Sequence, residues 1–474
     1  MTIIESVFGP ELGHLSAPEA ARRSGLRFVR SGTELGVFEA SRNPTGHVLT
    51  AWEAFHAYGL DKLEEAREYG SAILVGPSGI ENTLHRRARE LRLQQSTVAR
   101  EAAFPPEVVQ RAKRLAPDNE IGDLERIGFV LGLDELRLGY QPPAEGDDAL
   151  AIRLRTLRPP RATDARRLSA HAVLTFAHAA SVIRTQHRLQ SWLNLARYAP
   201  QFNPEEDYGN AVQPAYRVGY ALADDARKIL GISNSPIESM KNLVETNLGI
   251  PVIQAELPRH IAGATIAVSD SQYTDVRGIV LNTVGANENV WVRRATLAHE
   301  LGHLLFDPIQ RLDRVQVDTY ESNEIDPQDG SIDYVEQRAN AFAISFLAPM
   351  DEVRELTPTP LRSESIRNVM STFGISHTAA RYHTFNSHYR QYPLPQDQTT
   401  VGPSDEQKAA ENFTLDYFPV ERTPLVRRGR FSAVVNASYE QGYISIDSAA
   451  KYLCCNKKEF EQASPVIHDL FGLN

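Results

Sequence analysis

Residues 296–308 read TLAHELGHLLFDP, and this stretch decides how the rest of the chain is interpreted. Its apolar spacing predicts a buried helix that ends before Pro308. On such a helix His299 and His303 lie four residues apart on one face, so both imidazoles can bind one metal ion. Glu300 is rotated off that axis, where it suits a general base acting on water better than a ligand. The alternative is an ordinary helix whose histidines are satisfied by carbonyl groups or solvent.

A catalytic zinc ion needs a third protein ligand. The segment DYVEQRANAFAISFLAPM (333–350) supplies a candidate, because its apolar residues recur at helical spacing. Glu336 lies one turn before that apolar face, where its carboxylate could reach the two histidines. The alternative is an acid in the first turn of a helix, which the helix dipole favours.

Composition excludes several classes of protein. The 474 residues are 42% hydrophobic and 23% charged, which is typical of a globular protein with two to four domains. No run of 18 apolar residues exists, and the N-terminus lacks the basic flank of a secretory signal, so we expect no membrane partner. Cys454 and Cys455 are adjacent and imply no disulfide framework, which favours a reducing, cytoplasmic location.

The pattern along the chain predicts a mostly helical, multidomain α+β protein. Short apolar runs at PVIQAEL, AGATIAVS and RGIVLNT, between residues 251 and 283, are typical of a small sheet. We expect the last of them to be an edge strand that pairs with an extended substrate. Five parts are predicted: an N-terminal α/β region of unknown role (1–80), a helix-turn-helix (81–140), an Arg-rich helical connector (149–200), a peptidase domain (214–390) and a C-terminal helical module (408–474).

The motif HELGHLLFDP, followed by E-x-x-A-N-x-F-A-x-x-x-L-x-P from Glu336 to Pro349, resembles the ImmA/IrrE family of zinc peptidases. The resemblance covers about residues 214–390. It implies a zincin-like, thermolysin-like domain with His299, His303 and Glu336 as zinc ligands and Glu300 as the catalytic base. One departure is a long polar insert at 311–333, which could act as a lid, a substrate-selecting loop or an inhibitory flap. The sequence does not name the group that stabilises the oxyanion.

Residues 81–135 resemble an XRE-type helix-turn-helix, in which EVVQRAKR (107–114) would be the recognition helix. Arg111, Lys113 and Arg114 would then face phosphates, while Glu107 and Gln110 could reach base edges. The alternative is a helical bundle with a solvated basic face. The segment 151–197 carries nine arginines and one acid, Asp164, on a chain of net charge −10. It could extend a DNA contact, clamp the acidic insert or simply be solvated.

These patterns favour a cytoplasmic regulatory zinc endopeptidase with a DNA-binding module. The family resemblance implies that it cleaves a repressor or antitoxin-like protein in response to stress, DNA damage or mobile elements. Its expected partners are that protein substrate and double-stranded DNA, and we expect a homodimer because XRE-type modules usually work as dimers. A site with two histidines and one glutamate also accepts manganese or other divalent ions. The alternatives are a non-proteolytic DNA-binding sensor and the toxin of a toxin–antitoxin pair.

Overall fold

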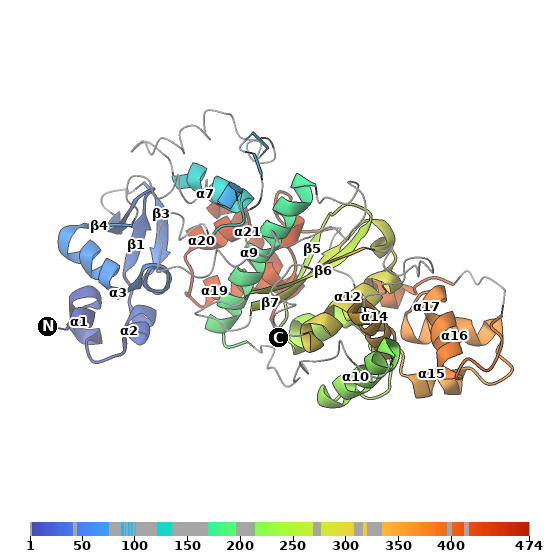
Figure 1. Ribbon diagram of the computed structural model, residues 1–474. Helices are drawn as coiled ribbons and strands as arrows, with labels where there is room; N and C mark the ends of the chain where they lie inside the picture. Colours follow the sequence, from blue (N-terminus) through green and yellow to red (C-terminus); the bar gives the residue numbers. More distant parts are fainter. Residues whose placement is uncertain are drawn as a thin grey trace. The chain divides into compact units, whose positions relative to one another are not determined.

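The computed structural model describes residues 2–40, 45–74, 121–134, 169–195, 214–268, 276–307, 316–319, 334–395, 401–411 and 417–473, with a few residues between 87 and 100. Its contacts divide the chain into two compact units. Unit 1 joins Met1–Leu195 and Ser269–Thr274 to Thr414–Asn474, and unit 2 comprises Ala196–Val268 and Asp275–Phe413. The described elements make a mostly helical α+β chain, as predicted (Figure 1). Within these ranges no helix is both long and apolar enough to cross a membrane.

Unit 2 contains a four-stranded sheet with the order β5-β7-β6-β8. The strands are β5 (Val252–Ala255), β6 (Ile261–Val268), β7 (Val276–Asn282) and β8 (Gln316–Thr319). β5 pairs with β7 in parallel, whereas β6 is antiparallel to both β7 and β8. The three strands expected from apolar runs are thus confirmed, and the insert contributes a fourth.

The expectation that the strand in RGIVLNT lies at an edge is wrong. β7 pairs with β5 on one side and with β6 on the other, so its backbone has no open edge. Six of its seven residues are buried. A continuous apolar run of this kind is typical of a strand covered on both faces, whereas alternation would indicate a strand with one solvated face.

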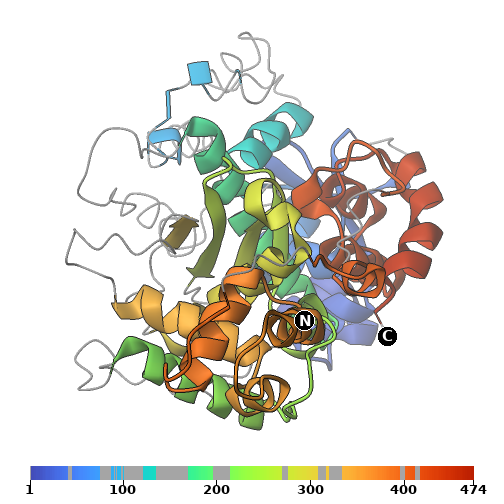
Figure 2. The same ribbon diagram turned by 90° about the vertical axis from the view of Figure 1, so that its right-hand side faces the viewer.

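Two long helices of unit 2 lie side by side, and one of them packs against the sheet (Figures 1 and 2). α12 (Val290–Phe306) packs against β6 and β7, and α14 (Tyr334–Leu347) packs between α12 and α10 (Ala215–Ile229). The remaining helical elements are α11 (Met240–Asn242) with a π-helical turn η6 (Leu243–Asn247), η7 (Gly285–Glu288), α15 (Met350–Leu356), α16 (Ser363–Phe373), α17 (His377–Ser387) and α18 (Asp405–Ala410).

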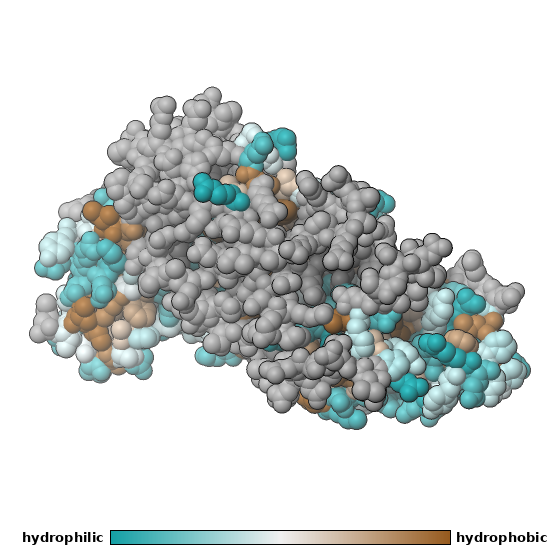
Figure 3. All heavy atoms as spheres, in the orientation of Figure 1, coloured by the Kyte–Doolittle hydropathy of each residue, from teal (hydrophilic) through white to brown (hydrophobic). Residues whose placement is uncertain are grey.

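Unit 1 contains a separate antiparallel sheet with the order β3-β1-β2-β4. Its strands are β1 (Arg27–Arg30), β2 (Glu34–Val37), β3 (His47–Thr50) and β4 (Ser71–Ile73). Its helical elements are α1 (Ile3–Phe8), η1 (Pro10–Leu12), α2 (Ala17–Arg23), α3 (Ala51–Tyr69), α7 (Ile121–Val130), α9 (Ala170–Trp192), η9 (Leu425–Arg427), α19 (Arg430–Glu440), α20 (Ile446–Tyr452) and α21 (Lys457–Phe471). Apolar side chains reach the surface at its N-terminal end (Figure 3), where Ile3 and Ile73 are exposed.

The N-terminal sheet and the C-terminal helices share one core. α20 packs against β3, and buried hydrogen bonds join the two segments, since His47 Nε2 lies 2.9 Å from Ser448 Oγ. The predicted five-part division stays a prediction, because several of its boundaries fall outside the described ranges. The same holds for the helix-turn-helix, whose second and third helices lie largely on residues that the structure does not describe.

Candidate metal centre

α12 carries the HExxH motif as a buried helix with defined ends. The side chain of Asn289 accepts the backbone N–H of Trp291 and caps the first turn. The helix stops at Phe306, and Asp307 is extended, as is usual for a residue that precedes proline. The apolar residues predicted to bury this helix are at most 1% exposed: Leu297, Ala298, Leu301, Leu304 and Leu305.

α14 approaches α12 closely because Gly302 lies between the two histidines. A Cβ atom there would come within 2.7 Å of the Phe342 ring. The small residue therefore lets α14 pack against the motif and brings its first turn, with Glu336, to the histidines.

The structure brings His299, His303 and Glu336 together. The two Nε2 atoms lie 3.0 Å apart, and the Glu336 carboxylate lies 3.3 Å from His299 Nε2 and 3.6 Å from His303 Nε2. One ligand atom from each residue falls within 4.8 Å of the others. Nitrogen ligands of one tetrahedral zinc ion are expected about 3.3 Å apart, so these positions fit a shared cation.

Two further side chains orient the imidazoles. His299 Nδ1 lies 3.0 Å from Asn340 Oδ1, and His303 Nδ1 lies 2.9 Å from Asp307 Oδ2. Each Nδ1–H thus donates to an oxygen, and each Nε2 presents its lone pair to the same point. Two facing lone pairs repel unless a proton or cation lies between them, so the donor set fits zinc.

The charges of the neighbouring carboxylates also favour a cation between the two imidazoles. Burial disfavours a charged imidazole, yet the carboxylates of Asp307 and Glu336 raise the pKa of His303 well above its ordinary value. Burial likewise opposes ionisation of Glu336, but the neighbouring histidines lower the pKa of its carboxyl. Asp307 is also held by Arg338 of α14. The carboxylates therefore make the point between the imidazoles favourable for a cation.

Glu300 is fully buried between α12 and β6. The hydroxyl of Thr265 donates to Glu300 Oε2 across 2.5 Å. Gly263 faces the other carboxylate oxygen, and a Cβ atom there would lie 2.9 Å from Oε1. β6 thus holds Glu300, the residue that the sequence predicts to be the catalytic base, in a fixed position.

Two neighbouring polar residues of α17 do not belong to this group. His383 is buried and donates from Nε2 to the carbonyl of Ala348 at 2.7 Å, and Tyr382 is exposed. The residues predicted to contact DNA lie outside the described part of the chain: Glu107, Gln110, Arg111, Lys113 and Arg114.

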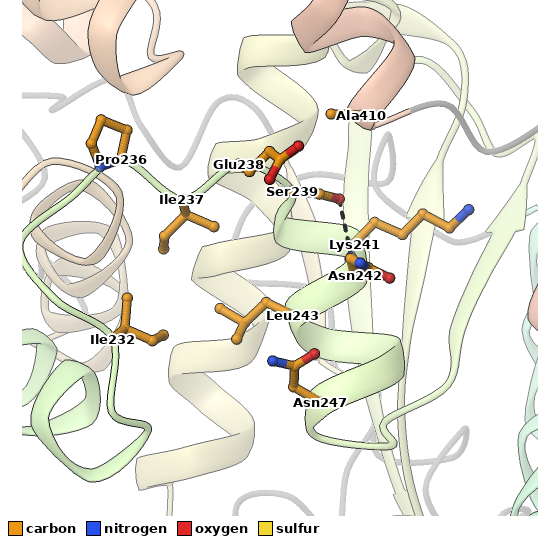
Figure 4. A pocket seen from close by; sticks show the side chains of 10 residues that line it. All are labelled: Ile232, Pro236, Ile237, Glu238, Ser239, Lys241, Asn242, Leu243, Asn247 and Ala410. Carbon is orange, nitrogen blue, oxygen red and sulfur yellow. Dashed lines mark hydrogen bonds between the residues drawn. The ribbon is translucent and has the colours of Figure 1, made fainter. Parts of the chain in front are cut away.

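A cavity of about 460 Å³ lies elsewhere in unit 2. Figure 4 shows Ile232, Ile237 and Leu243 facing one another across it, with Lys241 pointing away. Its lining includes neither the metal group nor Glu300, so it is distinct from the candidate centre.

Comparison with known families points to the same part of the chain. Residues 266–384 match the Peptidase_M78 family model, described as the IrrE N-terminal-like domain. The matched range includes α12 and α14, and it implies a metallopeptidase. No curated protein matches the chain.

Sequence reasoning missed the residues that orient the site. Asp307 lies four residues after His303, and Asn340 lies four residues after Glu336, so helical spacing offered a signal for both. Thr265 offered no such signal, because only the fold brings β6 beside α12.

Proposed function

We propose that this chain is a regulatory zinc endopeptidase whose active site is the group of His299, His303, Glu336 and Glu300. The observation that carries the proposal is the convergence of three ligand atoms, with both imidazoles oriented through their Nδ1 atoms. The match to a metallopeptidase family over residues 266–384 supports it.

The chemistry is hydrolysis of a peptide bond. When bound, zinc would supply the Lewis acidity that activates a water molecule and polarises the scissile carbonyl. The Glu300 carboxylate takes the proton from the attacking water and delivers it to the leaving amine. Thr265 holds that carboxylate in place. Because Glu300 is fully buried, bulk water is kept away from the transferred proton.

The test compares wild type with Glu300→Gln and His299→Ala, using a dye-quenched unfolded protein as substrate and elemental analysis for zinc. We expect about one zinc per chain in wild type and in Glu300→Gln, and loss of zinc in His299→Ala. Glu300→Gln should lower cleavage by at least about 100-fold. Equal cleavage by wild type and Glu300→Gln would contradict the proposed base and favour a sensor role.

The proposal also covers the natural substrate and DNA binding. We propose that the natural substrate is a repressor or antitoxin-like protein and that residues 81–140 bind DNA; the resemblances in the sequence support both. Alanine at Arg111, Lys113 and Arg114 should weaken DNA binding across sequences and reduce its salt dependence, measured by gel shift at several salt concentrations. Unchanged binding would place the DNA contact elsewhere or remove it.

A further inference from the structure

Strand β8 comes from the polar insert between the two parts of the metal group. It follows His303 and precedes Glu336 in the chain, and it is the outer strand of the sheet beside β6. Among the strands that the structure describes, β6 would be the edge of the sheet without β8. The insert therefore covers an edge that the other strands leave open.

That edge is the one next to Glu300. The two β6 residues that approach the Glu300 carboxylate are Gly263 and Thr265. In the antiparallel register β8 places Asp318 opposite Gly263 and Gln316 opposite Thr265. The backbone of β8 thus runs about 4.8 Å from the residues that hold the base.

The opposite edge of the sheet does not offer the same access. β5 is separated from β6 by β7, so it lies about 10 Å, or two strand spacings, from the strand that contacts Glu300. A peptidase substrate presents an extended backbone, and extended peptides bind by adding a strand to an open sheet edge. The edge of β6 is therefore the favourable place for a peptide to reach Glu300.

We propose that β8 occupies the substrate-binding edge of β6 and acts as a built-in competitor of an extended protein substrate. This inference rests on the proposed peptidase function. A segment of the same chain competes at an effective concentration in the millimolar range. Four residues of strand form few ladder bonds, so a substrate with better pairing displaces β8. The substrate strand then runs antiparallel to β6, as β8 does.

The experiment weakens the β6–β8 ladder in the full-length protein. Proline removes a backbone N–H and disrupts strand pairing, whereas alanine at the same position keeps the backbone donor. We compare Val317→Pro with Val317→Ala. Gln316→Pro is the second variant, because neighbouring N–H groups in a strand point to opposite edges and one of the two prolines must remove a donor that faces β6.

Two readouts are taken: hydrogen exchange of the β6 amides (Ile261–Val268) and kcat/KM on the unfolded protein substrate. At least one proline variant should lose protection in β6 and gain about tenfold or more in kcat/KM, while Val317→Ala behaves as wild type. Unchanged zinc content shows that the centre remains folded. Protection of β6 that is the same in both proline variants and in Val317→Ala overturns the proposal.

A third readout is independent of activity. A labelled peptide with the sequence of residues 312–323 is titrated, by fluorescence anisotropy, into variants that also carry Glu300→Gln. It should bind the proline variant that exposes β6 at least about tenfold more tightly than it binds Val317→Ala. Equal binding overturns the inference. If the peptide binds as expected but no variant cleaves protein, the competition at β6 stands and the proposed peptidase function fails.

Discussion

At the scale of single residues, the contact between Asp307 and His303 predicts how tightly the proposed metal centre would bind zinc. Asp307→Asn replaces the charged acceptor of both His303 and Arg338 by a neutral one. Because such outer partners fix the ligand's tautomer and orientation, zinc affinity should fall about 10- to 100-fold. The measurement is competition with a chelating dye. Asp351→Asn, an exposed acid on α15, is the control and should bind zinc as wild type does.

The buried His383 predicts a pH dependence of stability. Burial lowers the pKa of this imidazole to about 4, despite its hydrogen bond to Ala348. In the unfolded chain it titrates near 6.5, so as the pH falls below 6.5 the unfolded state binds the proton first. The free energy of unfolding should therefore fall by about 1.4 kcal/mol per pH unit, or about 3 kcal/mol by pH 4.

His383→Gln isolates this contribution, because the amide keeps a donor for the Ala348 carbonyl and does not titrate. Urea denaturation at pH 7 and pH 5 should show about 2 kcal/mol less pH sensitivity in the variant than in wild type. Identical pH dependence of the two proteins would show that His383 is not the group responsible.

At the scale of residues, the sequence predicts those neighbours that are set by the periodicity of a helix. That His299 and His303 lie on one face of a helix could be predicted, because a helix fixes side-chain direction over four residues. The hydrogen-bond partner of Glu300 could not be predicted, because Thr265 lies 35 positions away and reaches the Glu300 carboxylate only through packing of α12 on β6.

At the scale of elements, the close approach of α10 to α14 predicts a sensitive glycine. A Cβ atom at Gly219 would come within 2.4 Å of the Arg338 carbonyl oxygen and 2.8 Å of Ala341 Cβ. Backbone cannot move aside as a flexible side chain can, so Gly219→Ala should force the helices apart and cost about 1–3 kcal/mol. It should also weaken zinc binding, because α14 carries Glu336.

The control for this prediction lies on the same helix. Ala221 is exposed, so Ala221→Ser should change the free energy of unfolding by no more than about 0.5 kcal/mol. Thermal denaturation and zinc titration of both variants provide the comparison. A more stable Gly219→Ala variant would mean that its gain in helix propensity exceeds the clash.

The sequence predicted which segments form strands more successfully than it predicted which strands pair with each other. The apolar runs identified β5, β6 and β7, but a run alone does not tell a central strand from an edge strand. The pairing of β7 depends on β5, which precedes it by some 25 residues. β8 escaped prediction because QVDT lies in a polar insert, where its strand conformation comes from pairing with β6 and not from its own composition.

At the scale of the whole chain, the first and last segments of unit 1 depend on each other. Glu53, at the start of α3, accepts the backbone N–H of Thr50 at 2.8 Å and that of Ser445 at 2.9 Å. Ser445 caps α20 and donates its hydroxyl to the carbonyl of Val48. Burial raises the pKa of Glu53, which indicates that this carboxyl is desolvated. One side chain thus joins positions almost 400 residues apart.

Glu53→Ala should therefore loosen both ends of the chain at once. It leaves two buried N–H groups without their acceptor, at about 1–3 kcal/mol each, so we expect a loss of about 2–6 kcal/mol. Hydrogen exchange should increase together in β3 and in the first turn of α20. Glu53→Gln retains an acceptor oxygen and should lose less, and Asp61→Ala, at an exposed position on α3, should lose almost nothing. Faster exchange confined to α3 would show that the two segments fold independently, and the C-terminal helices would then be a separate module, as the sequence suggested.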